Sequence, residues 1–422
     1  MRLGAFAQNA KLKRSAFMQN LETDCCIAGG GPAGMMLGYL LARQGVDVIV
    51  LEKHQDFLRD FRGDTVHPST MQVLHELGLL ERFLARPHEK TEQIGLNIND
   101  RHYRIVDFRH LPVAARYVAF MPQWEFLDFL ADEAKALPNF RLMMSTRADR
   151  LLGRDGVITG VRAETGGEEI RIRAGLTVAC DGRGSTLRDA AALKLIDKGA
   201  PIDVLWFSLP RDETQAGDES LGHIGPGGFL VTINRGSYWQ CAFVIEKGGE
   251  AALKEAGIDA MKQKITEIAP GFETAAGALE SFDDIKRLDV QVSRLETWWR
   301  DGLLAIGDAA HAMSPVGGVG INLALQDAIA AAQILAPHLK SGRVPRRILE
   351  KVQTRREWPA CITQSVQVFA HERVILPAIR RTGKPGVPLA VKLLNAVPLL
   401  RRLPARAIGL GPRPEHWKGS GA

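Results

Sequence analysis

The sequence predicts an α/β protein, in which a Rossmann-like nucleotide-binding domain carries an inserted antiparallel β-sheet domain and a C-terminal helical segment broken by prolines. Three observations support this fold class. A strand–helix–strand pattern with a glycine-rich turn lies near the start, two strand-rich stretches interrupt the middle, and seven of the 21 prolines fall within the last 50 residues. The 422 residues are 45% hydrophobic and 24% charged, which suffices for a large core and excludes a disordered chain.

The first element is a glycine-rich turn between a strand and a helix. The order is a strand at 24–28, Gly29, Gly31 and Gly34 at G-x-G-x-x-G spacing, a helix at 33–44, a strand at 46–51 and Glu52. In such a turn Gly29 permits the tight bend, Gly31 lets the backbone approach a pyrophosphate, and Gly34 lets the helix pack closely on the strand. The helix N-terminus at Ala33 attracts phosphates, and Glu52 can accept hydrogen bonds from a ribose. Because these parts are in register, they predict a dinucleotide site.

The middle of the chain contains two stretches with strand patterns, at 95–108 and 202–245. Glycine turns separate the apolar segments of the second stretch, which is typical of an antiparallel sheet. Alternation along the last of these segments puts Tyr238 and Gln240 on the face opposite to Trp239. We expect the face of Tyr238 and Gln240 to line a site, although these side chains would also suit the core of a sheet.

A second binding pattern follows a short apolar strand at 303–306. Gly307 and Asp308 come directly after this strand, and a glycine-rich loop at 315–322 opens a long apolar helix that Asp327 interrupts. An acid in this place can hold the hydroxyl groups of a polyol. The N–H groups at the start of the helix can face a ring carbonyl that gains negative charge on reduction. The pattern therefore predicts a second region that binds a ring and an anion.

Together these motifs resemble those of the single-component FAD-dependent monooxygenases of the aromatic-hydroxylase class, which have the p-hydroxybenzoate hydroxylase fold. Four signatures match in order: Gly29–Gly34 with Glu52, Arg62-Gly63 ahead of a helix at 69–77, an Asp-Gly motif at 180–188, and Gly307-Asp308 with the loop at 315–322. The match extends from about residue 23 to residue 370. Jointly the signatures are far more specific than any single motif.

The resemblance implies a bound FAD and a role for each matching residue. The implied FAD contacts are Gly29, Gly31, Ala33, Gly34, Glu52, Lys53, Arg62, Gln123, Asp181, Asp308, Gly320, Ile321 and Asn322. Glu52 would bind the adenosine ribose and Asp308 the ribityl chain. Arg62 would reach the pyrophosphate or the incoming nicotinamide cofactor, and Asp181 would shape the groove that both cofactors use. Pro315 would lie near the reacting edge of the flavin and is a candidate catalytic residue.

Several of these residues also have a simpler structural explanation. Arg62 would suit a surface ion pair, and Asp181 would suit the cap of the helix that follows it. His67 lies in the loop that corresponds to the flavin pocket, and with Tyr238 it is a candidate catalytic residue. We expect His311, in contrast, to be a packed histidine rather than a catalytic base.

The implied reaction is a hydroxylation. NAD(P)H would bind transiently, because the chain has a single G-x-G-x-x-G motif, and would reduce FAD. Reaction with O₂ would then give a C4a-hydroperoxide that transfers OH to a hydrophobic, aromatic or polycyclic small molecule. Trp206, Phe229, Tyr238 and Gln240 are the candidate substrate residues. The alternative is an FAD-dependent dehydrogenase or reductase acting on a polyprenyl or quinone-like substrate.

The implied domain boundaries follow the signatures. A basic extension covers 1–22, the FAD-binding domain 23–94, 117–200 and 285–340, the substrate-binding sheet domain 95–116 and 201–284, and a C-terminal helical cap 341–422.

The net charge of +6 arises at the two ends of the chain. The range 373–422 has ten basic residues and one acid, and 1–22 has four basic residues and one acid, so that the body between them is mildly acidic. This distribution argues against nucleic-acid binding. We expect the basic tail to cap the pocket, and weak contact with a membrane surface is the alternative.

The cysteines and the apolar runs indicate the compartment. The five cysteines form no C-x-x-C pair, which indicates a reduced, cytoplasmic protein without a structural metal. The first 20 residues lack the apolar region of a secretory signal. No uncharged apolar run reaches the length of a membrane span, so we expect no transmembrane helix.

Overall fold

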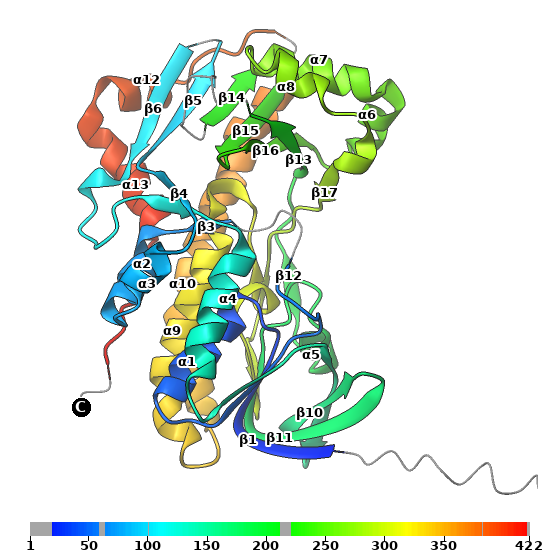
Figure 1. Ribbon diagram of the computed structural model, residues 1–422, viewed down its shortest axis with the longest axis vertical. Coiled ribbons are helices and arrows are strands. Elements are labelled where there is room, and N and C mark those ends of the chain that lie inside the picture. The colour runs from blue at the N-terminus through cyan, green and yellow to red at the C-terminus, as the bar shows by residue number, and fades with distance from the viewer. Residues whose placement is uncertain (1–18, 59–63, 100, 212–220, 382, 420–422) are drawn as a thin grey trace, which may run out of the picture.

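The computed structural model describes residues 19–58, 64–99, 101–211, 221–381 and 383–419. Two large sheets organise the protein (Figure 1). An eight-stranded sheet lies beside the long helices in the lower half of the view, and a seven-stranded sheet lies in the upper half. Segments from distant parts of the sequence form both sheets, as the interrupted motifs predict.

The eight-stranded sheet carries the glycine-rich turn. Its order is β19 (Trp299–Arg300), β20 (Leu303–Ala305), β11 (Glu168–Ala179), β1 (Gln19–Ala28), β2 (Val48–Leu51) and β8 (Phe140–Met143), and β10 (Val157–Thr165) and β9 (Thr146–Arg154) continue it from β11. From β20 to β8 all neighbours in this order are parallel. The central strands are buried on both faces, as parallel sheets between helices usually are. The predicted Rossmann-like fold is confirmed.

Strand β1 begins earlier than the sequence predicts. The motif predicts a strand from Asp24 and a loose extension up to residue 22, but Gln19 already lies opposite Ile170 of β11. The long hairpin of β10 and β11 offers backbone hydrogen bonds beyond the apolar run, so the polar residues before Asp24 also pair. The expected extension over residues 1–18 lies outside the described residues.

Four helices pack around this sheet: α1 (Pro32–Arg43), α4 (Gln123–Lys135), α9 (Gly320–Leu339) and α10 (Arg346–Ala370). Helix α9 lies between α1 and α10 (Figure 1). In the described part of the chain, the stretch Val316–Leu339 is long and apolar enough to cross a membrane by length and composition. However, 78% of its most apolar window is buried inside the protein, so α9 is a core helix.

The seven-stranded sheet corresponds to the predicted inserted sheet, with one correction. Its order is β17 (Lys286–Leu288), β13 (Ile202–Pro210), β16 (Tyr238–Glu246), β15 (Gly228–Asn234), β14 (Leu221–Gly225), β5 (Gln93–Ile98) and β6 (Arg101–Asp107). The sequence predicts an antiparallel sheet, but β14 and β5 are parallel. These two strands belong to different stretches of the chain, and no hairpin joins them, so alternation alone could not give their direction.

The two faces of this sheet pack against different partners. Helices α6 (Glu250–Ala256), α7 (Ile258–Ile268) and α8 (Glu273–Gly277) cover one face, where Trp239, Cys241 and Phe243 are buried. Ala242 and Val244 point to the other face, in a cluster that includes Val290 and Ile375. The alternation along β16 is therefore the one that the sequence predicts.

Short elements join the two halves. They are α2 (Pro68–Glu76), α3 (Leu80–Leu84), α5 (Thr186–Ala190), the sheet of β3 (Thr65–Val66), β7 (Val118–Phe120) and β4 (Glu89–Thr91), and the sheet of β12 (Leu195–Asp197), β18 (Ser293–Leu295) and β21 (His311–Ala312).

After α10 the chain forms only short helical pieces in its described part, as the prolines predict. These pieces are η5 (His371–Ile375), α11 (Leu376–Arg380), α12 (Leu389–Ala396), η6 (Pro398–Arg401) and α13 (Arg402–Gly409). Helices α12 and α13 pack on β6 (Figure 1). The exact domain boundaries remain a prediction.

Candidate active site

The glycine-rich turn between β1 and α1 leaves room for a ligand at one of its glycines. Gly29 has a φ of +108°, and a Cβ there would lie 2.3 Å from the carbonyl oxygen of Cys180. A Cβ on Gly34 would lie 1.9 Å from the carbonyl oxygen of Gly29. Gly31 differs, because a Cβ there would meet no protein atom within 4 Å. Packing thus requires Gly29 and Gly34, whereas the space in front of Gly31 and the N-terminus of α1 fits a pyrophosphate.

Glu52 lies at the end of β2, directly beside this turn. It is 5% exposed, and its Oε2 accepts a hydrogen bond of 3.0 Å from the N–H of Gly30. Its Oε1 accepts a hydrogen bond of 3.0 Å from the N–H of His54. The carboxylate is therefore held in one orientation next to the phosphate position, which fits an acceptor for a ribose. Lys53, the next residue, is exposed.

Asp308 lies just after β20 on the same side of the sheet. Its Oδ2 accepts a hydrogen bond of 3.1 Å from Nε of Arg183, and Arg183 also donates to the carbonyl oxygen of Met313 at 3.1 Å. The N–H of Gly307 donates to Oδ2 of Asp327 at 3.1 Å. These hydrogen bonds hold both residues of the Gly307-Asp308 motif in place, and the carboxylate of Asp308 remains partly exposed.

Asp181 makes contacts that hold the start of α5. Its Oδ1 accepts from the hydroxyl group of Ser185, and its Oδ2 accepts from the N–H of Leu187 at 3.2 Å. The N-cap residue itself is Ser185, whose hydroxyl accepts from the N–H of Arg188 at 3.0 Å. Asp181 thus supports the cap, as the simpler explanation of this residue expects, and its role in the groove remains a prediction.

The loop before α9 is clamped by buried polar side chains. His67 is 1% exposed, and its ring nitrogens each lie 2.9 Å from a carbonyl oxygen, that of Gly318 and that of Ile408. Burial lowers the pKa of His67 although these two carbonyl groups oppose the shift. The hydroxyl group of Thr65 also donates to the carbonyl oxygen of Gly318, at 3.0 Å. Held between these two carbonyl groups, His67 positions the loop, and its catalytic role remains a prediction.

Asn322 fixes the first turn of α9. Its Oδ1 accepts hydrogen bonds from the hydroxyl groups of Ser69 at 2.8 Å and Thr70 at 2.9 Å, both on α2. Gly320 and Ile321 are half-buried at the start of the same helix. The amide oxygen of Asn322 is therefore occupied, and the backbone of this turn can face a flavin ring.

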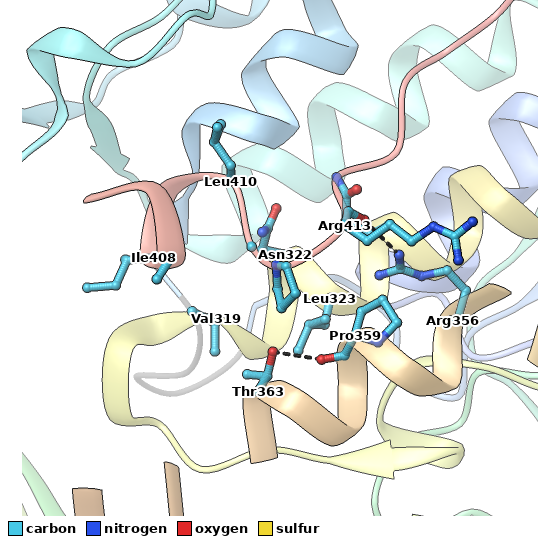
Figure 2. Close-up of a pocket in the computed structure, with 13 residues that line it drawn as sticks. Val319, Asn322, Leu323, Arg356, Pro359, Thr363, Ile408, Leu410 and Arg413 are labelled. Carbon is cyan, nitrogen blue, oxygen red and sulfur yellow. Dashed lines mark hydrogen bonds between the residues drawn. The ribbon is translucent and has the colours of Figure 1, made fainter. Parts of the chain in front are cut away.

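A cleft lies behind this loop, between α9, α10 and the C-terminal segment (Figure 2). Val319, Leu323, Pro359, Ile408 and Leu410 form its apolar lining, and its volume is about 30 Å³. It is too small for the expected substrate.

The predicted substrate residues lie on the sheet face that meets the loop. Trp206 and Phe229 are half-buried and pack in one apolar cluster with Val316, which follows Pro315. Pro315 is half-buried, and its carbonyl oxygen accepts from the N–H of Gly318 at 2.9 Å. Tyr238 is half-buried at the start of β16. Trp206, Phe229 and Val316, which belongs to the segment expected to border the flavin, thus pack against the same buried cluster.

The side chain of Gln240 hydrogen-bonds to another residue of the protein, unlike a side chain that is free to bind substrate. It is 1% exposed, and its Oε1 accepts a hydrogen bond of 2.8 Å from Nε of Arg235. Arg235 also forms a buried ion pair of 2.5 Å with Asp64, which joins the two halves of the protein. Burial raises the pKa of Asp64 and lowers the pKa of Arg235, although each partner opposes the shift of the other. Nη1 of Arg235 is buried and has no hydrogen-bond partner among the described residues.

One predicted cofactor residue, Gln123, lies next to Asp64. Gln123 is the first residue of α4 and is half-buried, and its backbone hydrogen-bonds to Asp64. Arg62 lies outside the described residues.

A buried charge network that the sequence motifs do not predict lies behind the Gly307-Asp308 motif. Asp327 accepts from Nε2 of His311 at 2.6 Å and from Nε of Arg356 at 3.0 Å, and Nη1 of Arg356 lies 3.2 Å from Oε1 of Glu415. All four side chains are at most 3% exposed. Burial raises the pKa of Asp327, but His311 and Arg356 outweigh it and hold the pKa below its ordinary value. The expectation that His311 is a packed residue agrees with this geometry.

A sequence profile described as an FAD binding domain matches residues 22–365, which is most of the chain. The chain belongs to this family. Its relatives in the family include 6-methylpretetramide 4-monooxygenase of Streptomyces rimosus, which is 32% identical over 388 residues covering 90% of each chain. Rifampicin monooxygenase of Streptomyces venezuelae is 29% identical over 79% of this chain and 68% of its own length. This FAD-binding family member is an FAD-dependent monooxygenase, so the resemblance drawn from the four signatures is confirmed.

Solved structures of flavoproteins share the fold. The p-nitrophenol 4-monooxygenase PnpA of Pseudomonas putida superposes with a TM-score of 0.75 at 18% identity, covering 94% of this chain and 100% of that one. At this identity the likeness shows the fold alone.

Proposed function

We propose that this monooxygenase uses NAD(P)H and O₂ to hydroxylate a polycyclic aromatic small molecule. Two curated relatives support the substrate class by their names, 6-methylpretetramide 4-monooxygenase at 32% identity and 12-dehydrotetracycline 5-monooxygenase/anhydrotetracycline 6-monooxygenase at 28%. The apolar composition of the sheet face agrees with a large hydrophobic ligand. All five cysteines are free thiols, which supports a reducing compartment and hence the cytoplasm.

One observation carries this proposal. Val316, in the loop that leads into α9, packs in the same cluster as Trp206 and Phe229 of the seven-stranded sheet. The loop starts at Pro315 and ends at the N-terminal turn of α9, where the backbone can face a flavin ring. A ring held at this turn would therefore have the apolar sheet face beside it, which is the arrangement that a hydroxylation of a greasy substrate needs.

The chain's own residues would bind and orient the reactants. Glu52, the space at Gly31 and Asp308 would hold the ribose, the pyrophosphate and the ribityl chain. Bound FAD supplies the redox chemistry, because it accepts a hydride from NAD(P)H and activates O₂. His67 and Asn322 would keep the loop and the first turn of α9 in place, and the cluster around Val316 would exclude water.

Arg235 is our candidate for orienting the substrate. Its Nη1 is buried without a protein partner, and such a group costs free energy unless it donates a hydrogen bond. A carbonyl or phenolate oxygen of the substrate would satisfy it. Asp64 and Gln240 hold the other nitrogens of Arg235, so Nη1 would be presented in a fixed direction.

The test is oxygen-dependent turnover. The purified protein, saturated with FAD, is mixed with NADH or NADPH and a panel of phenols, quinones and tetracyclic aromatic compounds, and both cofactor oxidation and product mass are followed. We expect a product heavier by one oxygen atom only with an aromatic ring system and O₂. A dehydrogenase or reductase acting on a quinone-like or polyprenyl substrate would instead convert it under anaerobic conditions without a gain of oxygen.

A further inference from the structure

Between Leu389 and Leu403 the chain presents large apolar side chains to solvent. The exposed fractions are 80% for Leu389, 50% for Leu393, 39% for Val397, 62% for Leu399 and 67% for Leu403. Leu389 and Leu393 are four residues apart in α12, so they share one face of the helix, and Val397 follows directly after its end. We call the outer surface of 389–403 the α12–α13 face. Such a concentration of exposed leucines on a short segment is typical of a binding surface.

The inner side of this segment is firmly attached to the protein. The N–H of Arg104 on β6 donates to Oδ1 of Asn395 at 3.0 Å, and Nδ2 of Asn99 donates to the carbonyl oxygen of Pro385 at 2.6 Å. The guanidinium group of Arg401 donates to two carbonyl groups near the end of α12, at 2.9 and 2.5 Å. The leucines are therefore exposed on an anchored helix.

Basic side chains surround the exposed leucines. From Arg373 to Arg413 the sequence has nine basic residues and no acid. Lys384, Lys392 and Arg402 are exposed, and none of them forms an ion pair with a described residue. The neighbouring strand β6 adds the exposed Arg101 and Arg104. The apolar face thus lies within a frame of unpaired positive charge contributed by two distant parts of the chain.

We propose that the α12–α13 face docks on an anionic lipid bilayer. Leucines within a frame of lysine and arginine match the interface of such a bilayer, where acyl chains lie beneath negatively charged headgroups. The binding is peripheral and reversible, since the helices are short and only one face is apolar.

This proposal also changes the expectation for the tail. From the sequence, a pocket cap and a membrane contact are alternatives, whereas we now assign them to two different parts of the tail. Ile408 and Glu415 bond to His67 and Arg356 inside the protein, and 389–403 faces outward. The inference does not depend on the substrate or on the reaction.

A second exposed apolar stripe provides a matched control. On α10, Trp358, Ile362, Val366 and Phe369 are 53%, 39%, 61% and 63% exposed. Acids such as Glu357 belong to the same helix, so this stripe lacks the continuous basic frame. If lipid binding needs both leucines and positive charge, substitutions in this stripe should have no effect.

The experiment is vesicle flotation with the full-length protein. Vesicles of phosphatidylcholine, with and without phosphatidylglycerol, are tested at low and at high salt. We expect flotation only with phosphatidylglycerol and at low salt. The double variant Leu389→Ser/Leu393→Ser and the double variant Lys392→Glu/Arg402→Glu should each lower vesicle affinity by about tenfold or more. Val366→Ser/Phe369→Ser on α10 should leave it unchanged.

Several outcomes would overturn the proposal. One is that the wild type does not float with vesicles, and another is that the α10 control loses as much affinity as the leucine variant. Full binding by the leucine variant would assign lipid contact to another surface. Finally, if sedimentation shows that the wild type is a dimer and the leucine variant is not, the face is a contact between copies of the chain. Because all substituted side chains are at least half-exposed or on the surface, an unchanged melting curve will show that each variant is folded.

Discussion

Replacing Gly31 by alanine tests whether this residue serves cofactor binding rather than the stability of the fold. The new Cβ would meet no protein atom within 4 Å, and the φ of −72° and ψ of −177° at this residue suit alanine. Alanine is a poorer N-cap than glycine by several tenths of a kcal/mol, whereas its smaller unfolded-state entropy stabilises by about 0.4–1 kcal/mol. The two effects nearly cancel, so we expect the free energy of unfolding of the apoprotein to change by less than about 1 kcal/mol.

The effect on FAD should be large because the methyl group occupies the space that we assign to the pyrophosphate. We expect the Kd for FAD to rise by about tenfold or more, corresponding to more than about 1.4 kcal/mol. The assay is a fluorescence titration of the apoprotein with FAD, paired with urea unfolding of the apoprotein. Gly34→Ala is the control, since its Cβ would lie 1.9 Å from the carbonyl oxygen of Gly29 and should cost about 3 kcal/mol or more of stability.

The reasoning fails if Gly31→Ala binds FAD as tightly as the wild type. It also fails if Gly31→Ala loses as much apoprotein stability as Gly34→Ala, because then the open space at Gly31 would serve packing rather than a ligand.

Three further predictions concern buried polar groups. Asp327→Asn leaves Arg356 and His311 without their buried carboxylate, so unfolding by urea should show a loss of about 3–5 kcal/mol, and a loss below about 1 kcal/mol would contradict the network. Arg235→Lys keeps the positive charge but removes Nη1, so the KM in steady-state kinetics should rise about tenfold while the FAD absorbance stays unchanged. An unchanged KM would refute the contact between Arg235 and the substrate. Burial lowers the pKa of His223 to about 4, so the unfolded state binds a proton at this group before the folded state does. The free energy of unfolding is therefore unaffected by this group above about pH 6.5 and falls by about 3 kcal/mol between there and about pH 4. His223→Leu should flatten the pH dependence of urea unfolding in that window, and an equally steep dependence in the variant would contradict the assignment.

The motifs predicted the cofactor region because each of them depends on local backbone geometry. At Gly34, for example, a Cβ would collide with a carbonyl group, so any chain that forms this turn needs glycine at this position. Glu52 was predictable for a similar reason, since its place at the end of β2 follows from strand length alone. The order of the four signatures along the chain then carried the family resemblance.

The contacts between distant segments could not be predicted in this way. The parallel pairing of β14 with β5, the pairing of Gln19 with β11 and the ion pair of Asp64 with Arg235 each join residues whose separation carries no periodic pattern. The position of His67 between two carbonyl groups likewise depends on Ile408, more than 300 residues later.

Two signals for the buried network were nevertheless present in the sequence. Asp327 is an acid within an otherwise apolar helix, and a buried acid requires a partner. Glu415 is the single acid of the last 50 residues. Joining the two through Arg356 required the three-dimensional structure.

The central claim is that this chain is a monooxygenase that transfers an oxygen atom from O₂ to an aromatic ring. The most direct test is turnover of the FAD-loaded protein under ¹⁸O₂ with NAD(P)H and a polycyclic aromatic substrate, analysed by mass spectrometry. We expect one ¹⁸O atom in each product molecule and none from labelled water. Product that forms without O₂, or that takes its oxygen from water, would contradict the account.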